Sequence, residues 1–142
     1  MPKFKKLENG SQIAVEDTGE PTTGTRRLSV TEQEARILAQ LTRGATVLEI
    51  GTGLGISTRA MAETATLVTT FDIDTWVHEN IFPTLQGVRT VVSLAPLSGY
   101  TFEVVFIDAA HDADSVKQDI EIARAHLERG GLIVLHDVKM PS

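Results

Sequence analysis

Several features are missing from this sequence of 142 residues, and each absence excludes a class of protein. Because it contains no cysteine, disulfides and thiolate-bound zinc or iron–sulfur sites are excluded. No apolar run approaches the roughly 18 residues that a membrane-spanning helix needs, and the basic start leads into a polar stretch rather than an apolar signal segment. We therefore expect a soluble, cytoplasmic protein with no membrane partner.

Positive charge is also scarce, with 13 Lys and Arg against 19 Asp and Glu, a net charge of −6. This balance disfavours a nucleic-acid partner, because nucleic-acid-binding proteins contact the phosphate backbone through clusters of Lys and Arg. The content of 42% hydrophobic and 23% charged residues is typical of a globular domain, and the length suits one hydrophobic core. We expect an N-terminal arm over residues 1–28, with a hairpin turning at Asn9-Gly10, and one domain over residues 29–142.

Strands alternate with helices from Thr31 onward. A Thr31-x-x-Glu34 capping box predicts the start of the first helix, and Gly44 its end. Short apolar runs predict five strands, and helical periodicity predicts three further helices, the last ending at Gly130-Gly131. The predicted strands are residues 46–50, 67–71, 88–93, 102–107 and 132–135. Two of the helices are residues 56–64 and residues 75–82, the second limited by Pro83. The third is predicted from an apolar stripe of Val116, Ile120, Ala123 and Leu127. This alternation predicts an α/β domain with a parallel sheet and a ligand site beyond the carboxyl ends of its strands.

A glycine-rich loop follows the first of these strands. Gly51, Gly53 and Gly55 stand between a predicted strand and a predicted helix, where glycine lets the backbone turn sharply and approach a ligand. The dinucleotide fingerprint G-x-G-x-x-G has its third glycine one residue later, at the position that Ile56 occupies in this chain. Because Glu49 would repel a pyrophosphate, the loop favours a cationic ligand.

Asp72 ends the second strand, 21 residues after Gly51. A carboxylate at this place accepts hydrogen bonds from the two ribose hydroxyls of a nucleoside ligand. The residues therefore predict a ligand with a ribose and a positive charge, while a nicotinamide-dependent oxidoreductase stays open as an alternative.

The stretch Val-Leu-Glu-Ile-Gly-Thr-Gly-Leu-Gly-Ile-Ser-Thr, residues 47–58, resembles the first motif of class I S-adenosylmethionine-dependent methyltransferases. Asp72 matches the ribose-binding acid of that superfamily. Residues 105–119 and 130–138 are similar to a subgroup related to catechol-type O-methyltransferases, so that the resemblance covers about residues 29–138.

The resemblance implies a set of cofactor-binding residues. Glu49 would hold the ammonium of S-adenosylmethionine directly or through water, Asp72 would bind its ribose, and Ile73 and Ser93 would contact adenine. The glycine loop would surround the methionine part, and the full set is Glu49, Gly51, Thr52, Gly53, Gly55, Ser57, Asp72, Ile73 and Ser93. Trp76 is close enough to cover adenine but is expected to lie in the core.

A second group of polar residues, Asp108, His111, His136 and Asp137, follows the fourth and fifth strands. These strands are predicted neighbours, with backbones roughly 5 Å apart, so the side chains can share one site. Asp108, His111 and Asp137 are the candidate catalytic residues. Asp108 and Asp137 could hold Mg²⁺ against a substrate hydroxyl, or His111 could act as the general base. Metal-dependent relatives carry lysine and asparagine where this chain has His111 and Val138, which weakens the expectation of a metal.

The resemblance implies a Rossmann-like three-layer sandwich with strand order 3-2-1-4-5, lacking the usual final two strands. It also implies S-adenosylmethionine-dependent methyl transfer, which we expect to an oxygen of a small molecule. The alternative is a module that binds the cofactor or a protein without catalysis. Without the final strands the fifth strand would be an open edge, so we expect a homo-oligomer joined there, although the N-terminal hairpin could cover that edge instead.

Overall fold

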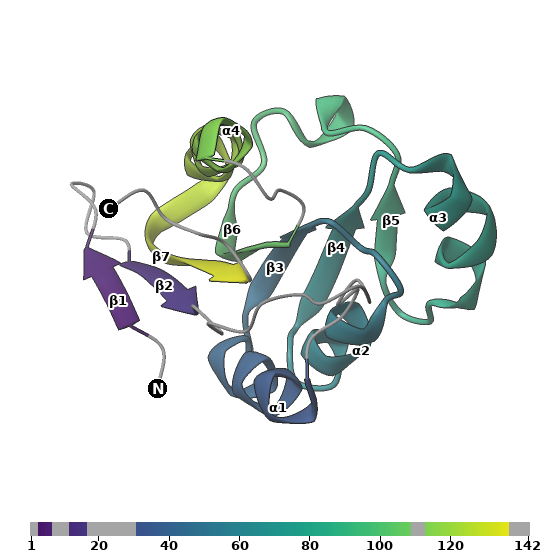
Figure 1. The fold of residues 1–142 in the computed structure, drawn as a ribbon, viewed down its shortest axis with the longest axis horizontal. Coiled ribbons are helices and arrows are strands. Elements are labelled where there is room, and N and C mark those ends of the chain that lie inside the picture. Colours follow the sequence, from purple (N-terminus) through teal and green to yellow (C-terminus); the bar gives the residue numbers. More distant parts are fainter. Residues whose placement is uncertain (1–2, 7–11, 17–30, 109–112, 137–142) are drawn as a thin grey trace.

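The computed structural model describes residues 3–6, 12–16, 31–108 and 113–136. Within them one sheet of seven strands runs through the molecule in the order β1-β2-β7-β6-β3-β4-β5 (Figure 1). The strands are β1 (Lys3–Lys6), β2 (Gln12–Glu16), β3 (Thr46–Ile50), β4 (Leu67–Phe71), β5 (Arg89–Val91), β6 (Phe102–Ile107) and β7 (Leu127–His136).

Five of these strands, β3 to β7, form a continuous parallel part of the sheet. Numbered along the chain, they lie in the order 3-2-1-4-5, which confirms the predicted topology. All their carboxyl ends therefore point to the same edge of the sheet.

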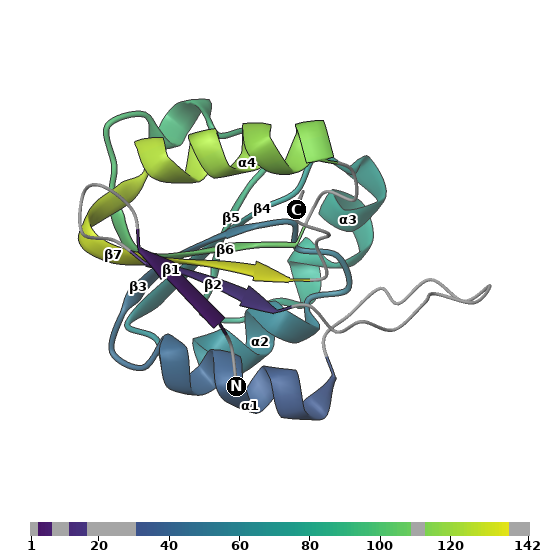
Figure 2. The same ribbon diagram turned by 60° about the vertical axis from the view of Figure 1, so that its left-hand side comes forward.

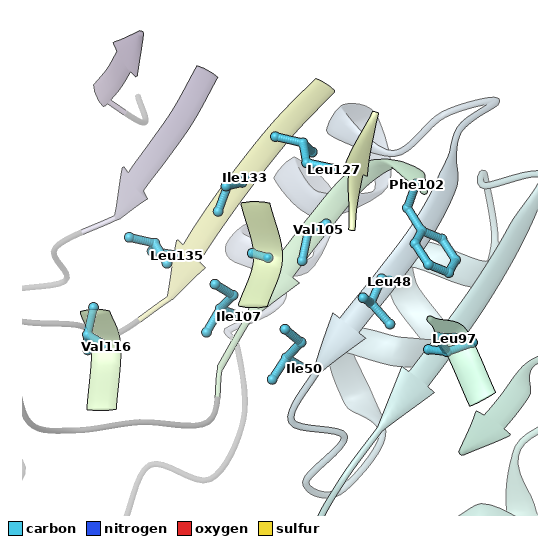
Figure 3. Close-up of a cluster of buried hydrophobic side chains, with 11 residues drawn as sticks. Leu48, Ile50, Leu97, Phe102, Val105, Ile107, Val116, Leu127, Ile133 and Leu135 are labelled. Carbon is cyan, nitrogen blue, oxygen red and sulfur yellow. The ribbon is translucent and has the colours of Figure 1, made fainter. Parts of the chain in front are cut away.

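Helices cover both faces of the sheet, giving three layers (Figure 2). The helix α4 (Ala113–Ala125) lies over one face, and α1 (Glu32–Leu41) and α2 (Ile56–Ala62) lie over the other. Successive strand residues point to opposite faces, and both faces are buried, because Leu48 packs under α4 while its neighbour Val47 packs under α1 and α2. Figure 3 shows the cluster on the α4 side, in which Leu48, Val105 and Ile133 come from three strands.

The capping box predicted at the start of α1 is confirmed, since the Thr31 hydroxyl accepts from the Glu34 backbone and the Glu34 carboxylate from the Thr31 backbone. The helix predicted over residues 75–82 is shorter. It is α3 (Thr75–Asn80), followed by a 3-10 turn (Phe82–Thr84) that contains Pro83. Proline is compatible with the first turn of such a helix, where its missing N–H is not needed, so the chain tightens here rather than stopping.

The predicted end of the last helix is wrong. Helix α4 ends at Ala125, and Gly130-Gly131 lie within β7, where the pairing with β6 shifts register. Leu127, expected on the helical stripe, starts β7 instead and packs into the same cluster as Val116 and Ala123. The helical periodicity placed Leu127 in the helix because a buried apolar residue at this position fits the core whether it belongs to the helix or to the following strand.

The fifth strand has no open edge, and the alternative that the N-terminal hairpin covers this edge is confirmed. Strand β2 pairs parallel to β7 over Gln12 to Glu16, and β1 pairs antiparallel to β2, so the N-terminal strands extend the sheet (Figure 1). The sheet thus has seven strands, and the β7 edge cannot join two copies while β2 occupies it. No helix among the described residues is long and apolar enough to cross a membrane.

Candidate functional site

The loop after β3 turns at three glycines with positive φ angles. Gly51 has φ 105°, Gly53 has φ 55° and Gly55 has φ 82°, and Gly55 caps α2. A Cβ atom at Gly55 would lie 3.1 Å from Leu85 Cδ2 and 3.2 Å from Ile81 Cγ2. Glycine is therefore required there both by the left-handed backbone and by close packing on the segment after α3.

Asp72, directly after β4, braces this loop. Its Oδ2 accepts a hydrogen bond from the Gly53 backbone N–H at 3.0 Å, and its Oδ1 accepts one from the Asp74 backbone N–H at 2.8 Å. The side chain is only partly buried. Because each carboxylate oxygen can accept more than one hydrogen bond, the oriented Asp72 carboxylate retains capacity for the hydroxyls of a ligand.

Glu49 lies in a cage of hydroxyl groups and is fully buried, with 0% of its surface exposed. Its carboxylate accepts from Ser57 Oγ at 2.6 Å, from Thr70 Oγ1 at 2.6 Å and from Thr58 Oγ1. Thr52 of the glycine loop hydrogen-bonds Thr70 at 2.6 Å, which ties the loop to the same cage. A direct contact between Glu49 and a cofactor ammonium would require the side chain to leave this arrangement.

Burial dominates the ionisation of Glu49. Desolvation, with a smaller contribution from the nearby charge of Asp108, raises its pKa to about 7, although its three hydroxyl partners act to lower it. Burial therefore favours the neutral form of this carboxyl group.

Large apolar side chains are exposed beyond β4 and β5. Ile73 is 83% exposed, Val92 61% and Trp76 52%, so the expectation that Trp76 lies in the core is wrong. Asp74 caps α3 by accepting from the Trp76 backbone N–H, which keeps the indole at the helix start. Ser93 is exposed, and its hydroxyl accepts from the Ala95 backbone N–H at 3.2 Å, a local turn contact.

Among the described residues, Asp108, after β6, contacts a histidine. Its Oδ1 lies 2.9 Å from His136 Nδ1 at the end of β7, and His136 Nε2 lies 2.8 Å from Glu34 Oε2 of α1. The hydrogen bonds from Thr31 and the charge of His136 keep the pKa of Glu34 below its usual value, although burial, the largest single influence, acts to raise it. Sequence reasoning placed Asp108 and His136 together correctly but missed Glu34, because only the capping box marked that residue.

His111 and Asp137, the other candidate catalytic residues, lie outside the described residues. Within the described part of the chain no group of three or more His, Asp or Glu side chains could hold a metal ion. The Mg²⁺ ion expected between Asp108 and Asp137 therefore gains no support from the described residues.

The model of a family described as a methyltransferase domain matches residues 48–138. A search of curated protein sequences finds no match.

Solved structures share the fold. A protein from Klebsiella pneumoniae, provisionally assigned as an O-methyltransferase, is 26% identical with a TM-score of 0.63, covering 78% of this chain and 57% of its own. A precorrin-6y C5,15-methyltransferase from Geobacter metallireducens is 19% identical with a TM-score of 0.62, covering 84% of this chain and 69% of its own. A tRNA (m1A58) methyltransferase from Aquifex aeolicus is 19% identical with a TM-score of 0.58, covering 73% of this chain and 46% of its own.

The last two identities are low enough that these likenesses show the fold alone. This chain spans little more than half the length of the Klebsiella protein. The family match covers the glycine loop, Asp72 and the ends of β6 and β7, while Glu34 of α1 lies outside it. The chain therefore belongs to the methyltransferase domain family, within the class I S-adenosylmethionine-dependent methyltransferases.

Proposed function

We propose that this chain transfers a methyl group from S-adenosylmethionine to an oxygen of a small molecule. The observation that carries the proposal is the bracing of the glycine loop by Asp72, whose two oxygens accept from the Gly53 and Asp74 backbones. This contact holds the glycine loop and an acid at the end of the next strand as one unit. A nucleoside with an amino-acid tail presents the matching groups to both.

The residues present fit the cofactor. Asp72 would bind the ribose hydroxyls, the loop of Gly51, Thr52, Gly53 and Gly55 would surround the amino-acid part, and the exposed Ile73 and Trp76 offer apolar surface to adenine. Glu49 and Ser57 would act indirectly, because the hydrogen bond between them is part of the hydroxyl cage that holds the loop in place. When bound, S-adenosylmethionine supplies a methyl group on a positively charged sulfur, which makes that carbon electrophilic.

Asp108 supports the acceptor side of the proposal. Its side chain is 21% exposed at the carboxyl end of β6, beside β3, which leads into the glycine loop. A carboxylate there can accept the proton that an acceptor hydroxyl loses when its oxygen forms the bond to carbon, and His111 and Asp137 remain further candidates for this role. The net charge of −6 favours a small acceptor over a nucleic acid such as the tRNA of the Aquifex relative.

Asp72→Asn tests the cofactor site. We expect the dissociation constant for S-adenosylhomocysteine, measured by calorimetry, to rise roughly 10- to 100-fold, because a hydrogen bond to a charged group contributes about 1.5–3 kcal/mol. The same change of acid to amide at the exposed Glu121 of α4 is the matched control and should leave affinity unchanged. Unaltered affinity in Asp72→Asn would remove this residue from the site.

Turnover separates the proposal from its rivals. Formation of S-adenosylhomocysteine with a panel of hydroxyl-bearing acceptors supports the enzyme, whereas tight cofactor binding without product across the panel supports a non-catalytic module. Thermal stabilisation by NAD but not by S-adenosylmethionine would instead favour a nicotinamide-dependent oxidoreductase.

A further inference from the structure

Three ionisable side chains from distant parts of the chain form a continuous hydrogen-bonded row. Glu34 of α1, His136 at the end of β7 and Asp108 after β6 are joined by contacts of 2.8 Å and 2.9 Å through the two ring nitrogens of the histidine. The histidine side chain is 3% exposed, and those of Glu34 and Asp108 are 11% and 21% exposed. Solvent therefore reaches the Asp108 end of the row more readily than the Glu34 end.

The histidine bridges the two carboxyl groups, with Nε2 facing Glu34 Oε2 and Nδ1 facing Asp108 Oδ1. Because each ring nitrogen can donate or accept a hydrogen bond, contacts at both nitrogens fix the orientation of the ring, and the ring in turn holds Asp108 Oδ1. Within the part of the chain that the structure describes, no hydrogen bond engages the other Asp108 oxygen, Oδ2.

The two oxygens of Glu34 have separate partners. Oε1 accepts from the Thr31 backbone N–H at 2.8 Å as part of the capping box, and Oε2 faces His136. The cap thereby fixes the Glu34 side chain at the start of α1, with one oxygen turned toward the sheet. This arrangement goes beyond helix capping, because a capping box needs only Oε1.

We propose that Glu34 and His136 are positioning residues, which hold the Asp108 carboxylate in one orientation toward the methyl acceptor. This inference rests on the proposed function, in which Asp108 faces the acceptor. Glu34 acts on Asp108 through His136, and neither residue need touch the cofactor or the acceptor.

The test compares Glu34→Gln with Glu32→Gln. Glutamine at position 34 can keep the capping box through its oxygen while its amide group replaces the acceptor facing His136. Glu32 lies on the same helix, where it pairs on the surface with Arg36, so the control makes the same substitution away from the row. The readouts are turnover at saturating S-adenosylmethionine, the dissociation constant of S-adenosylhomocysteine, and nitrogen-15 NMR of the histidine rings, which reports hydrogen exchange at each ring nitrogen.

We expect Glu34→Gln to lower turnover about tenfold or more, with affinity for S-adenosylhomocysteine unchanged and faster exchange of the His136 ring protons. Glu32→Gln should match the unmodified protein in all three. Unchanged turnover and exchange in Glu34→Gln would overturn the inference, as would a loss of cofactor affinity equal to the loss of turnover.

A second variant covers the outcome in which Glu34→Gln does not fold, as judged by circular dichroism. His136→Gln is then expected to show the same selective loss of turnover, and full turnover in that variant would overturn the inference. The proposed function fails separately if the unmodified protein binds no S-adenosylhomocysteine, because substitutions at Glu34 or His136 are not expected to abolish binding. The NMR signals of His136 in the unmodified protein and in Glu34→Gln can be measured whether or not S-adenosylhomocysteine binds.

Discussion

At the scale of single residues, the acid of the glycine-loop motif differs most from its expected role. The resemblance implied that Glu49 holds the cofactor ammonium, yet the side chain is fully buried and accepts from Ser57, Thr58 and Thr70. Three hydroxyl donors from α2 and β4 meet on this one carboxylate. The residue therefore links the loop, the helix and the neighbouring strand, and it can influence a ligand through the position of the loop.

Glu49→Gln should flatten the dependence of stability on pH. The folded protein raises the pKa of Glu49 from 4.5 to about 7, so folding favours the neutral form. The stability that this provides is fully present below pH 4.5 and is lost as pH rises through 7, by up to about 3 kcal/mol, an order-of-magnitude figure. Urea unfolding at pH 5 and pH 8 should show a smaller difference in Glu49→Gln than in the unmodified protein.

The exposed Glu121→Gln serves as the control and should keep the original profile. A Glu49→Gln profile as steep as that of the unmodified protein would contradict the assignment of this pH dependence to Glu49.

At the scale of secondary-structure elements, β7 depends on the pair Gly130-Gly131. Gly130 has φ 80° with open space around it, whereas a Cβ atom at Gly131 would lie 2.8 Å from the backbone oxygens of Glu103 and Glu128. The two glycines allow β7 to shift register against β6 between Leu127 and Leu132. They therefore permit an irregular strand, where the sequence pattern indicated a helix end.

Gly131→Ala should destabilise the fold by roughly 1–3 kcal/mol, because backbone atoms of β6 and β7 must move to admit the methyl group. Gly130→Asn is the matched control and should cost less than about 1 kcal/mol, since asparagine tolerates a left-handed backbone. Thermal and urea unfolding measure both. Equal effects would indicate that backbone conformation, rather than the close contact at Gly131, governs this segment.

At the scale of the whole molecule, the N-terminal strands complete the sheet. Strand β2 lies between β1 and β7, so both of its edges are hydrogen-bonded, and it occupies the edge at which self-association was expected. A protein with an uncovered edge strand is prone to pairing with another chain. The hairpin therefore replaces, within one chain, the contact that a second copy would have made; self-association through another surface stays a prediction.

Ala14→Pro should release the hairpin. Ala14 pairs with Phe4 of β1 and Val134 of β7, and proline in an interior strand removes a ladder hydrogen bond. We expect a loss of at least about 1 kcal/mol of stability and concentration-dependent association in analytical ultracentrifugation. Lys3→Pro, at the first residue of the edge strand β1, is the control and should be tolerated. A monomeric Ala14→Pro protein of unchanged stability would show that the β7 edge does not depend on β2.

Local sequence determined several of the strands and helices, together with the glycine-loop part of the site. Short apolar runs predicted β3, β4 and β6 to the residue, and the capping box predicted the start of α1. The spacing from Gly51 to Asp72 predicted which acid lies at the loop. These features depend on residues close in the chain or on the regular alternation of strand and helix, so the pattern alone carries them.

Only the tertiary structure decided what each side chain contacts. The row from Glu34 to Asp108 joins residues up to 102 positions apart, and no periodicity relates them. The burial of Glu49, the exposure of Trp76 and the pairing of β2 with β7 likewise depend on which surfaces meet once the sheet has assembled. Sequence patterns encode the tendency of a residue to be buried, whereas its partner is set by three-dimensional packing of segments that are remote along the chain.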